Sequence, residues 1–181
     1  MSTIHFNNFN IKDVPVDTVF VLDTNVLYYV HSGYSPKNPK DGIAYSNIIQ
    51  EIMNNGFKIH VSALSVQELL FCIENKEYKN YCDLNPSESK NYSKKQYRKN
   101  KSERTRVKQA LNTVLSELSI YTMDDGQIMY KSVDEFVNTY ETHKMDPMDY
   151  LLTLNYDFKK TIFISADKDF RSLNSIKVLT A

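Results

Sequence analysis

The chain has 181 residues, 22 of them basic and 22 acidic, so its formal net charge is zero. This length suits one domain with a well-buried core, and the balanced charge excludes nucleic-acid binding through a global positive excess. No apolar run of about 18 residues occurs and the first ten residues lack a signal-peptide pattern, so we expect no membrane span, no secretion and a cytoplasmic protein. Two cysteines, Cys72 and Cys82, form no zinc motif and favour no disulfide.

The first clear element is a buried strand that ends at an acidic residue. Residues 1–17 are polar and rich in asparagine, and we expect them to form only a lead-in arm. Val19–Leu22 is a continuous apolar run, which is typical of a central strand in a parallel sheet. Asp23 ends the run, and Thr24 and Asn25 can begin a helix. At this position Asp23 can be a ligand-binding carboxylate or a helix N-cap, and the local sequence allows both.

A second strand and a second acidic residue follow a crossover helix. Apolar residues recur at near-helical spacing over 41–55, and Phe57–Val61 then alternates like a shorter strand. Glu68 follows Ser65 by three residues, which is the spacing of a capping box and places Glu68 in the first turn of a helix. Glu68 can therefore be a capping residue or a second carboxylate at the edge of the sheet.

The segment at about residues 75–110 is a basic, tyrosine-containing helical insertion. Between Lys76 and Lys108 there are eleven lysines and arginines and four acidic residues. Such a segment can be a solvated helix pair or flexible insertion. Alternatively, its cations can bind phosphates, and its tyrosines can stack on unpaired bases at roughly 1 to 3 kcal/mol each. The candidate nucleic-acid-binding residues are Lys94, Lys95, Arg98, Lys99, Arg104 and Arg106.

The chain after the insertion predicts alternating helices and short strands. Residues 110–118 have helical spacing, 119–123 alternate like a strand, and 124–126 read as a turn. A further helix is predicted over Ile128–Tyr140. The segment therefore continues the alternation that is typical of a parallel sheet with helical crossovers.

The last third of the chain carries the remaining acidic residues. Asp146 suits the N-cap of a helix that has Pro147 at its first position and Asp149 at its third. Thr161–Ile164 is a buried β-type run, and residues 176–179 suggest a final strand. Three polar residues follow the buried run closely, namely Ser165, Asp167 and Asp169.

These acidic residues are expected to meet at one edge of the sheet. Parallel strands joined by right-handed crossovers place their carboxyl ends together. The four carboxylates that then converge are Asp23, Glu68, Asp149 and Asp167. Converging like charges repel unless cations hold them, and Mg²⁺ or Mn²⁺ prefers such oxygen ligands. The expected reaction is hydrolysis of a phosphodiester bond.

Several of these segments together resemble the PIN domain, a fold of metal-dependent ribonucleases that includes the VapC toxins of toxin–antitoxin pairs. The segments are VLDTNVL, the Ser-x-x-Glu-Leu that ends at Leu69, the helix led by Asp149, and SADKDF. The resemblance covers most of residues 18–180 without the insertion. It implies a single three-layer α/β domain in which helices flank a central parallel sheet of about five strands.

The resemblance also implies roles for individual residues. Asp23, Glu68, Asp149 and Asp167 correspond to the catalytic, metal-binding acidic quartet. Asp169 is then an additional metal-binding acid, Asn25 and Ser165 are polar neighbours that orient the site or substrate, and Asp146 competes with Asp149 to face the metal. The cofactor is Mg²⁺ or Mn²⁺, the substrate is RNA, and an antitoxin protein and a homodimer are further expected partners.

Two other readings compete with a ribonuclease. A catalytically inactive PIN-like scaffold would bind RNA or protein, and its acidic residues would be helix caps. A phosphatase of the haloacid dehalogenase type also begins with an aspartate at a strand end. That family has Asp-x-Asp, whereas here the second residue after Asp23 is Asn25, so the sequence disfavours it.

Overall fold

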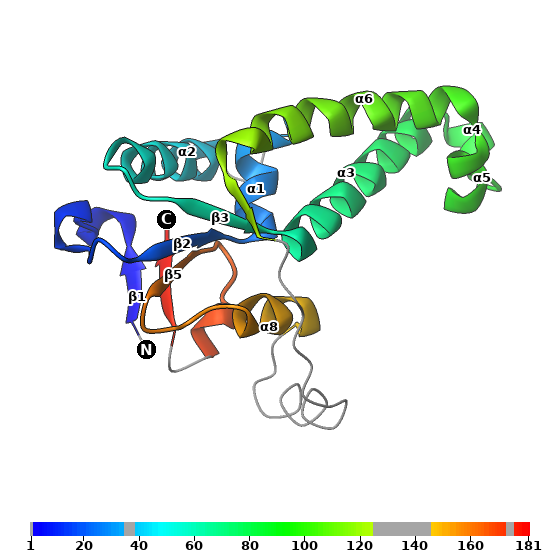
Figure 1. Ribbon diagram of the computed structural model, residues 1–181. Helices are drawn as coiled ribbons and strands as arrows, with labels where there is room; N and C mark the ends of the chain where they lie inside the picture. Colours follow the sequence, from blue (N-terminus) through cyan, green and yellow to red (C-terminus); the bar gives the residue numbers. More distant parts are fainter. Residues whose placement is uncertain (1, 35–38, 125–145, 173–175) are drawn as a thin grey trace.

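The computed structural model of the chain describes residues 2–34, 39–124, 146–172 and 176–181. In these ranges six strands form one parallel sheet in the order β1-β6-β5-β2-β3-β4 (Figure 1). The strands are β1 (Ser2–His5), β2 (Val19–Leu22), β3 (Ile59–Ser62), β4 (Thr122–Asp124), β5 (Thr161–Ile164) and β6 (Lys177–Thr180). The predicted parallel α/β fold is confirmed.

Helices lie on both sides of this sheet and make three layers (Figure 1). The α-helices are α1 (Thr24–His31), α2 (Pro39–Asn54), α3 (Ala63–Leu84), α4 (Pro86–Ser89), α5 (Lys94–Lys99), α6 (Lys101–Glu117) and α8 (Pro147–Leu154). Within the described ranges there are also four short 3-10 helices, η1 (Phe6–Asn8), η2 (Ile11–Asp13), η3 (Leu118–Ile120) and η4 (Asp169–Ser172). No helix in the described ranges is both long and apolar enough to cross a membrane.

Two hydrophobic cores, one on each face of the sheet, hold the layers together. Successive side chains of a strand point to opposite faces. Accordingly, Phe20 and Leu22 of β2 belong to the core beneath α1 and α2, whereas Val21 packs with Phe163 and Leu152 on the α8 side. Burial on both faces explains why β2 and β5 appear in the sequence as continuous apolar runs.

The structure corrects three expectations about local elements. Residues 1–17 are more than a lead-in arm, because β1 pairs with β6 and makes the sheet six-stranded instead of about five-stranded. The capping box at Ser65 is wrong: α3 begins at Ala63 because the Ser62 side chain accepts the hydrogen bond of the Leu64 N–H at 3.1 Å. The strand predicted at 119–123 lies slightly later, as β4. The predicted helix Ile128–Tyr140 falls outside the described residues.

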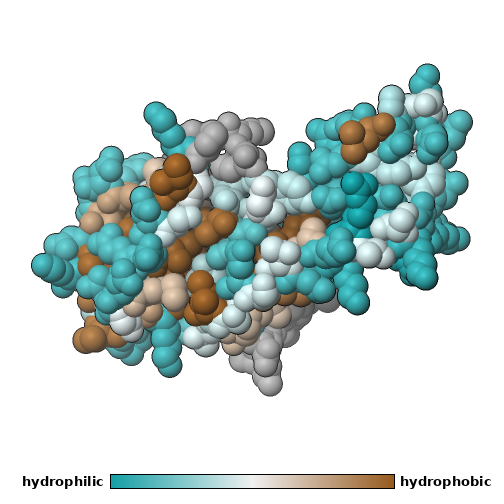
Figure 2. All heavy atoms as spheres, turned by 90° about the horizontal axis from the view of Figure 1, so that it is seen from above, coloured by the Kyte–Doolittle hydropathy of each residue, from teal (hydrophilic) through white to brown (hydrophobic). Residues whose placement is uncertain are grey.

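The basic insertion forms a helical arm that projects from the sheet. We define the arm as residues 75–110, which comprise the second half of α3, α4, α5 and the first half of α6 (Figure 1). Seen from above, this end of the molecule is mostly hydrophilic (Figure 2). Tyr97 is only 1% exposed and its ring lies 5.2 Å from that of Tyr78 and 5.6 Å from that of Tyr81. The arm therefore has a small aromatic core of its own, and Tyr97 is not accessible to a base.

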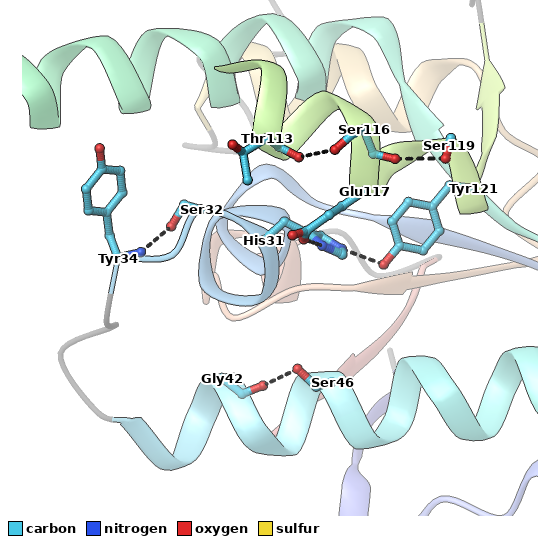
Figure 3. A network of polar contacts seen from close by, with 10 residues as sticks. All are labelled: His31, Ser32, Tyr34, Gly42, Ser46, Thr113, Ser116, Glu117, Ser119 and Tyr121. Carbon is cyan, nitrogen blue, oxygen red and sulfur yellow. Dashed lines mark hydrogen bonds and ion pairs between the residues drawn. The ribbon is translucent and has the colours of Figure 1, made fainter. Parts of the chain in front are cut away.

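A buried histidine ties the base of the arm to the sheet domain. His31, at the end of α1, places its Nδ1 2.8 Å from a carboxylate oxygen of Glu117. Its Nε2 lies 2.7 Å from the hydroxyl of Tyr121 (Figure 3). Because α1 begins directly after Asp23, this contact fixes the C-terminal end of the helix whose N-cap is Asp23.

Candidate active site

Six acidic residues line one pocket at the carboxyl edge of the sheet. The pocket has a volume of about 600 Å³ and opens where β2 and β5 end. Its acidic residues come from four separate segments of the chain and are Asp23, Glu68, Asp146, Asp149, Asp167 and Asp169. Every acidic residue predicted for the site therefore lines this single pocket.

Asp23 is both the N-cap of α1 and the most buried acid of the pocket. Its side chain is 2% exposed, and its two oxygens accept hydrogen bonds from the Thr24 N–H at 2.6 Å and the Ser165 hydroxyl at 2.5 Å. Burial raises the pKa of Asp23 to about 7, against the lowering effect of these two hydrogen bonds. The nearby charges of Glu68 and Asp167 make smaller contributions to this raised pKa. Asp23 is therefore a helix N-cap and a carboxylate of the pocket at the same time, so the two alternatives that the sequence allowed are both correct.

Asp149 has the most strongly raised pKa in the pocket. Burial is the main cause, followed by the charge of Asp23 and then by those of other acids in the pocket, and together they raise the pKa of Asp149 to about 8. In the described residues no lysine or arginine forms an ion pair with Asp23, Glu68, Asp149 or Asp167. These four carboxylates therefore lie close together without an ion-pair partner among the described lysines and arginines.

Hydrogen bonds from polar neighbours fix the carboxylates in place. The Thr24 hydroxyl donates to Glu68 Oε2 at 2.7 Å, while the Thr24 N–H donates to Asp23. Ser165 Oγ accepts from the Asp167 N–H at 2.9 Å and donates to Asp23. Asn25 accepts from the Ala166 N–H at 3.1 Å, so the start of α1 is tied to the loop after β5. The two polar neighbours predicted from the sequence, Asn25 and Ser165, are therefore both part of this network.

The last two acids lie at the outside of the pocket. Asp146 and Asp169 are exposed, and the Asp169 N–H donates to Asp167 Oδ1 at 2.8 Å. Asp146 precedes α8 and raises the pKa of Asp149 through its charge, after the larger effects of burial, Asp23 and Asp167. Asp149 is thus the more buried of the two candidates at the start of α8.

The oxygens of the pocket suit a hard divalent cation in chemistry, although they do not form a preformed cage. Carboxylate and hydroxyl oxygens are the ligands that Mg²⁺ and Mn²⁺ prefer. Among the residues that the structure describes, no group of three or more histidine, cysteine or acidic side chains is arranged closely enough to hold a metal ion. The donor set fits such an ion, which would have to draw these carboxylates closer together.

The basic residues predicted to bind nucleic acid lie on the arm and outside this pocket. The Lys94 ammonium lies 3.1 Å from the Glu74 carboxylate, and Arg98 binds the same carboxylate through two hydrogen bonds of 2.6 Å. Arg106 lies 3.6 Å from Glu103. The remaining candidates, Lys95, Lys99 and Arg104, are exposed. Half of the predicted set is thus already paired with carboxylates.

Other residues of the pocket were not identified from the sequence. They are Thr24, Tyr28, Tyr29, Cys72, Asn75, Lys76 and Lys79. The residues contributed by α3 follow Glu68 at intervals of three and four positions, which is the signal that could have revealed them. That signal is usable only once α3 is known to run unbroken from Ala63 to Leu84.

Comparison with solved structures identifies the fold. No protein-family model matches the sequence, and no curated protein matches it either. The chain aligns with a chain of the crystal structure of VapBC2 from Rickettsia felis, which is bound to a DNA fragment from the VapBC2 promoter. The TM-score is 0.52 at 14% sequence identity, and the alignment covers 89% of this chain and 97% of that chain. The chain has a VapC-like PIN-domain fold. The crystal structure of PAE2754 from Pyrobaculum aerophilum also aligns, with a TM-score of 0.46 at 10% identity over 90% of both chains. In this PIN fold the acidic pocket lies at the carboxyl edge of the parallel sheet.

Proposed function

We propose that the protein is a metal-dependent ribonuclease that hydrolyses RNA phosphodiester bonds in the acidic pocket. The main support is the convergence of Asp23, Glu68, Asp149 and Asp167, which are far apart in the sequence, on one pocket. Among the residues that the structure describes, no lysine or arginine forms an ion pair with any of the four. Burial, and after it the neighbouring charges, raises the pKa of Asp23 and Asp149, a cost that a protein seldom carries outside a functional site. The PIN fold is consistent with this activity.

The four carboxylates would hold Mg²⁺ or Mn²⁺, with Asp169 as an additional ligand. When bound, such an ion would make a water molecule more acidic and neutralise charge on the leaving oxygen. Thr24 orients Glu68 and Ser165 orients Asp23, so two of the carboxylates are held by hydroxyl groups before substrate arrives. Asn25 keeps the loop after β5 against α1 and so fixes the position of Asp167.

The test is cleavage of a labelled RNA in the presence of Mn²⁺. The wild type should cut the RNA, and Asp23→Asn should lose at least about 100-fold in rate, since it removes the buried carboxylate at the centre of the network. Asp83→Asn, which changes an exposed acid of α3, is the matched control and should retain full activity. Full Mn²⁺-dependent cleavage by Asp23→Asn would refute the proposal.

Metal binding by the wild type and by two aspartate variants distinguishes a ribonuclease from an inactive scaffold. Calorimetric titration with Mn²⁺ should show binding by the wild type and much weaker binding by Asp23→Asn and Asp149→Asn. A scaffold would bind RNA without cutting it, and its Mn²⁺ binding would not depend on these two residues.

We further propose that the protein is the toxin of a toxin–antitoxin pair, which implies an antitoxin protein as its partner. The support is the PIN fold shared with VapBC2 of Rickettsia felis. Induced expression should arrest growth in the wild type but not in Asp23→Asn, and co-expression of a small neighbouring reading frame should restore growth. Size-exclusion chromatography of the purified chain would also test the expected homodimer.

A further inference from the structure

The wall of the pocket formed by α3 changes from acidic to basic along the helix. Glu68, Cys72, Asn75, Lys76 and Lys79 line the pocket, and their spacing places them on one face of α3. With a rise of 1.5 Å per residue, Lys76 and Lys79 lie about 12 Å and about 16 Å along the helix from Glu68. A chain of negative charges that enters at the carboxylates would therefore meet these two cations next.

Both lysines keep their positive charge available for a ligand. In the described part of the chain neither Lys76 nor Lys79 forms an ion pair with a carboxylate. The Lys76 ammonium lies 5.8 Å from the centre of the Tyr34 ring, a contact that leaves its charge uncompensated. In this they differ from Lys94 and Arg98 further along the arm, which share the Glu74 carboxylate.

Two aromatic residues lie in the same pocket as the lysines. Tyr28 and Tyr29 of α1 line it. The ring of Tyr28 is stacked on that of Tyr34 at a centroid distance of 6.0 Å and an interplanar angle of 20°. An aromatic ring held in this way can stack on an unpaired base, at roughly 1 to 3 kcal/mol per base. The bases of a duplex are not free to do so.

We propose that Lys76, Lys79 and Tyr28 form a subsite for an unpaired RNA strand that leads away from the carboxylates. This inference rests on the proposed ribonuclease function and adds the path that the strand takes along α3, with the residues that bind it there. At roughly 3.4 Å per nucleotide of a stacked strand, the lysines contact phosphates about four or five nucleotides from the scissile bond. The lysines bind the backbone, so they provide affinity without base selectivity.

The test is RNA binding by variants in the Asp23→Asn background, which keeps the strand intact. Fluorescence anisotropy is measured with a labelled RNA of roughly twelve nucleotides, single-stranded or annealed, over a series of salt concentrations. The test variant carries Lys76→Ala and Lys79→Ala, and a second variant carries Lys76→Arg and Lys79→Arg. The control carries Lys12→Ala and Lys58→Ala, which remove equal charge from exposed positions before β2 and β3. Thermal unfolding checks that each variant is folded.

The alanine pair should weaken single-strand binding at least about tenfold. It should also make the slope of log K against log salt shallower by about 1.4, since each phosphate contact on a single strand contributes roughly 0.7. The arginine pair and the control should bind like the parent, and the duplex should bind more weakly than the single strand. An equal loss in the control, an unchanged slope in the alanine pair, or a preference for the duplex would overturn the proposal.

Failure of the proposed subsite and failure of the proposed ribonuclease function give different results. A protein that binds RNA through this lysine pair but never cuts it would refute the ribonuclease and leave the subsite intact. A ribonuclease whose affinity for RNA ignores the lysine pair would refute only the subsite.

Discussion

Removing the charge of Asp23 should stabilise the metal-free protein, although it abolishes the proposed activity. The carboxyl of Asp23 has an ordinary pKa of 3.8 and, chiefly because of burial, a pKa of about 7 in the folded protein. The folded state therefore holds a proton that the unfolded state releases, so the stability of the wild type falls as the pH rises from about 4 towards 8. At 1.36 kcal/mol per pH unit, the loss by about pH 8 is roughly 4 kcal/mol.

The assay is urea unfolding of the wild type and of Asp23→Asn in EDTA at several pH values. The variant lacks this titration, so its stability relative to the wild type should rise by roughly 4 kcal/mol between about pH 4 and 8. Loss of a hydrogen bond to Thr24 or Ser165 costs about 1 kcal/mol at every pH and does not change this trend. Asp83→Asn is the control and should follow the wild type. A difference between Asp23→Asn and the wild type that does not vary with pH would refute the account of a buried carboxylate with a raised pKa.

Three further predictions concern residues that hold the site and the arm. Thr24→Val removes the hydroxyl that donates to Glu68 and should weaken Mn²⁺ binding about tenfold by calorimetry, whereas Thr24→Ser should retain it; equal affinities would contradict the role of Thr24. Tyr97→Phe should be neutral or up to about 1 kcal/mol stabilising, because the buried Tyr97 hydroxyl has no hydrogen-bond partner among the described residues, whereas Tyr97→Leu should lose about 2 kcal/mol in urea unfolding. A marked loss of stability in Tyr97→Phe would show that the hydroxyl is bonded. His31→Ala should cost about 2 to 4 kcal/mol, since it opens a void and leaves the Tyr121 hydroxyl without this contact, and a loss under about 1 kcal/mol would mean that the link to α6 is weak.

The parallel sheet could be predicted because its central strands are buried on both faces. A strand that is buried on both faces has a continuous apolar sequence, so the bounds of β2 and β5 could be predicted. The acidic residue that follows β2, Asp23, was identified for the same reason. β1 was missed because it is a short edge strand with a polar sequence, which carries no periodic signal. Only its pairing with β6 makes it a strand.

The site was partly predictable for a related reason. Asp23 and Asp167 follow buried strands, and the topology of a parallel sheet brings such positions together. Glu68 lines the pocket, and the alternative of a capping box with Ser65 is wrong because Ser62 caps α3. Lys76 and Lys79 were assigned to the insertion, since the sequence does not reveal that α3 continues without a break from the pocket into the arm. The catalytic role of the acids remains a prediction.

The continuity of α3 means that the arm and the pocket share one rigid element. Glu68 lies near the start of a helix of 22 residues, the second half of which belongs to the arm. At 1.5 Å per residue this helix is about 33 Å long, so a small tilt at the arm translates into a shift at Glu68, while the Thr24 hydroxyl resists it. A molecule that binds the arm and tilts α3 would therefore change the position of the Glu68 carboxylate without entering the pocket.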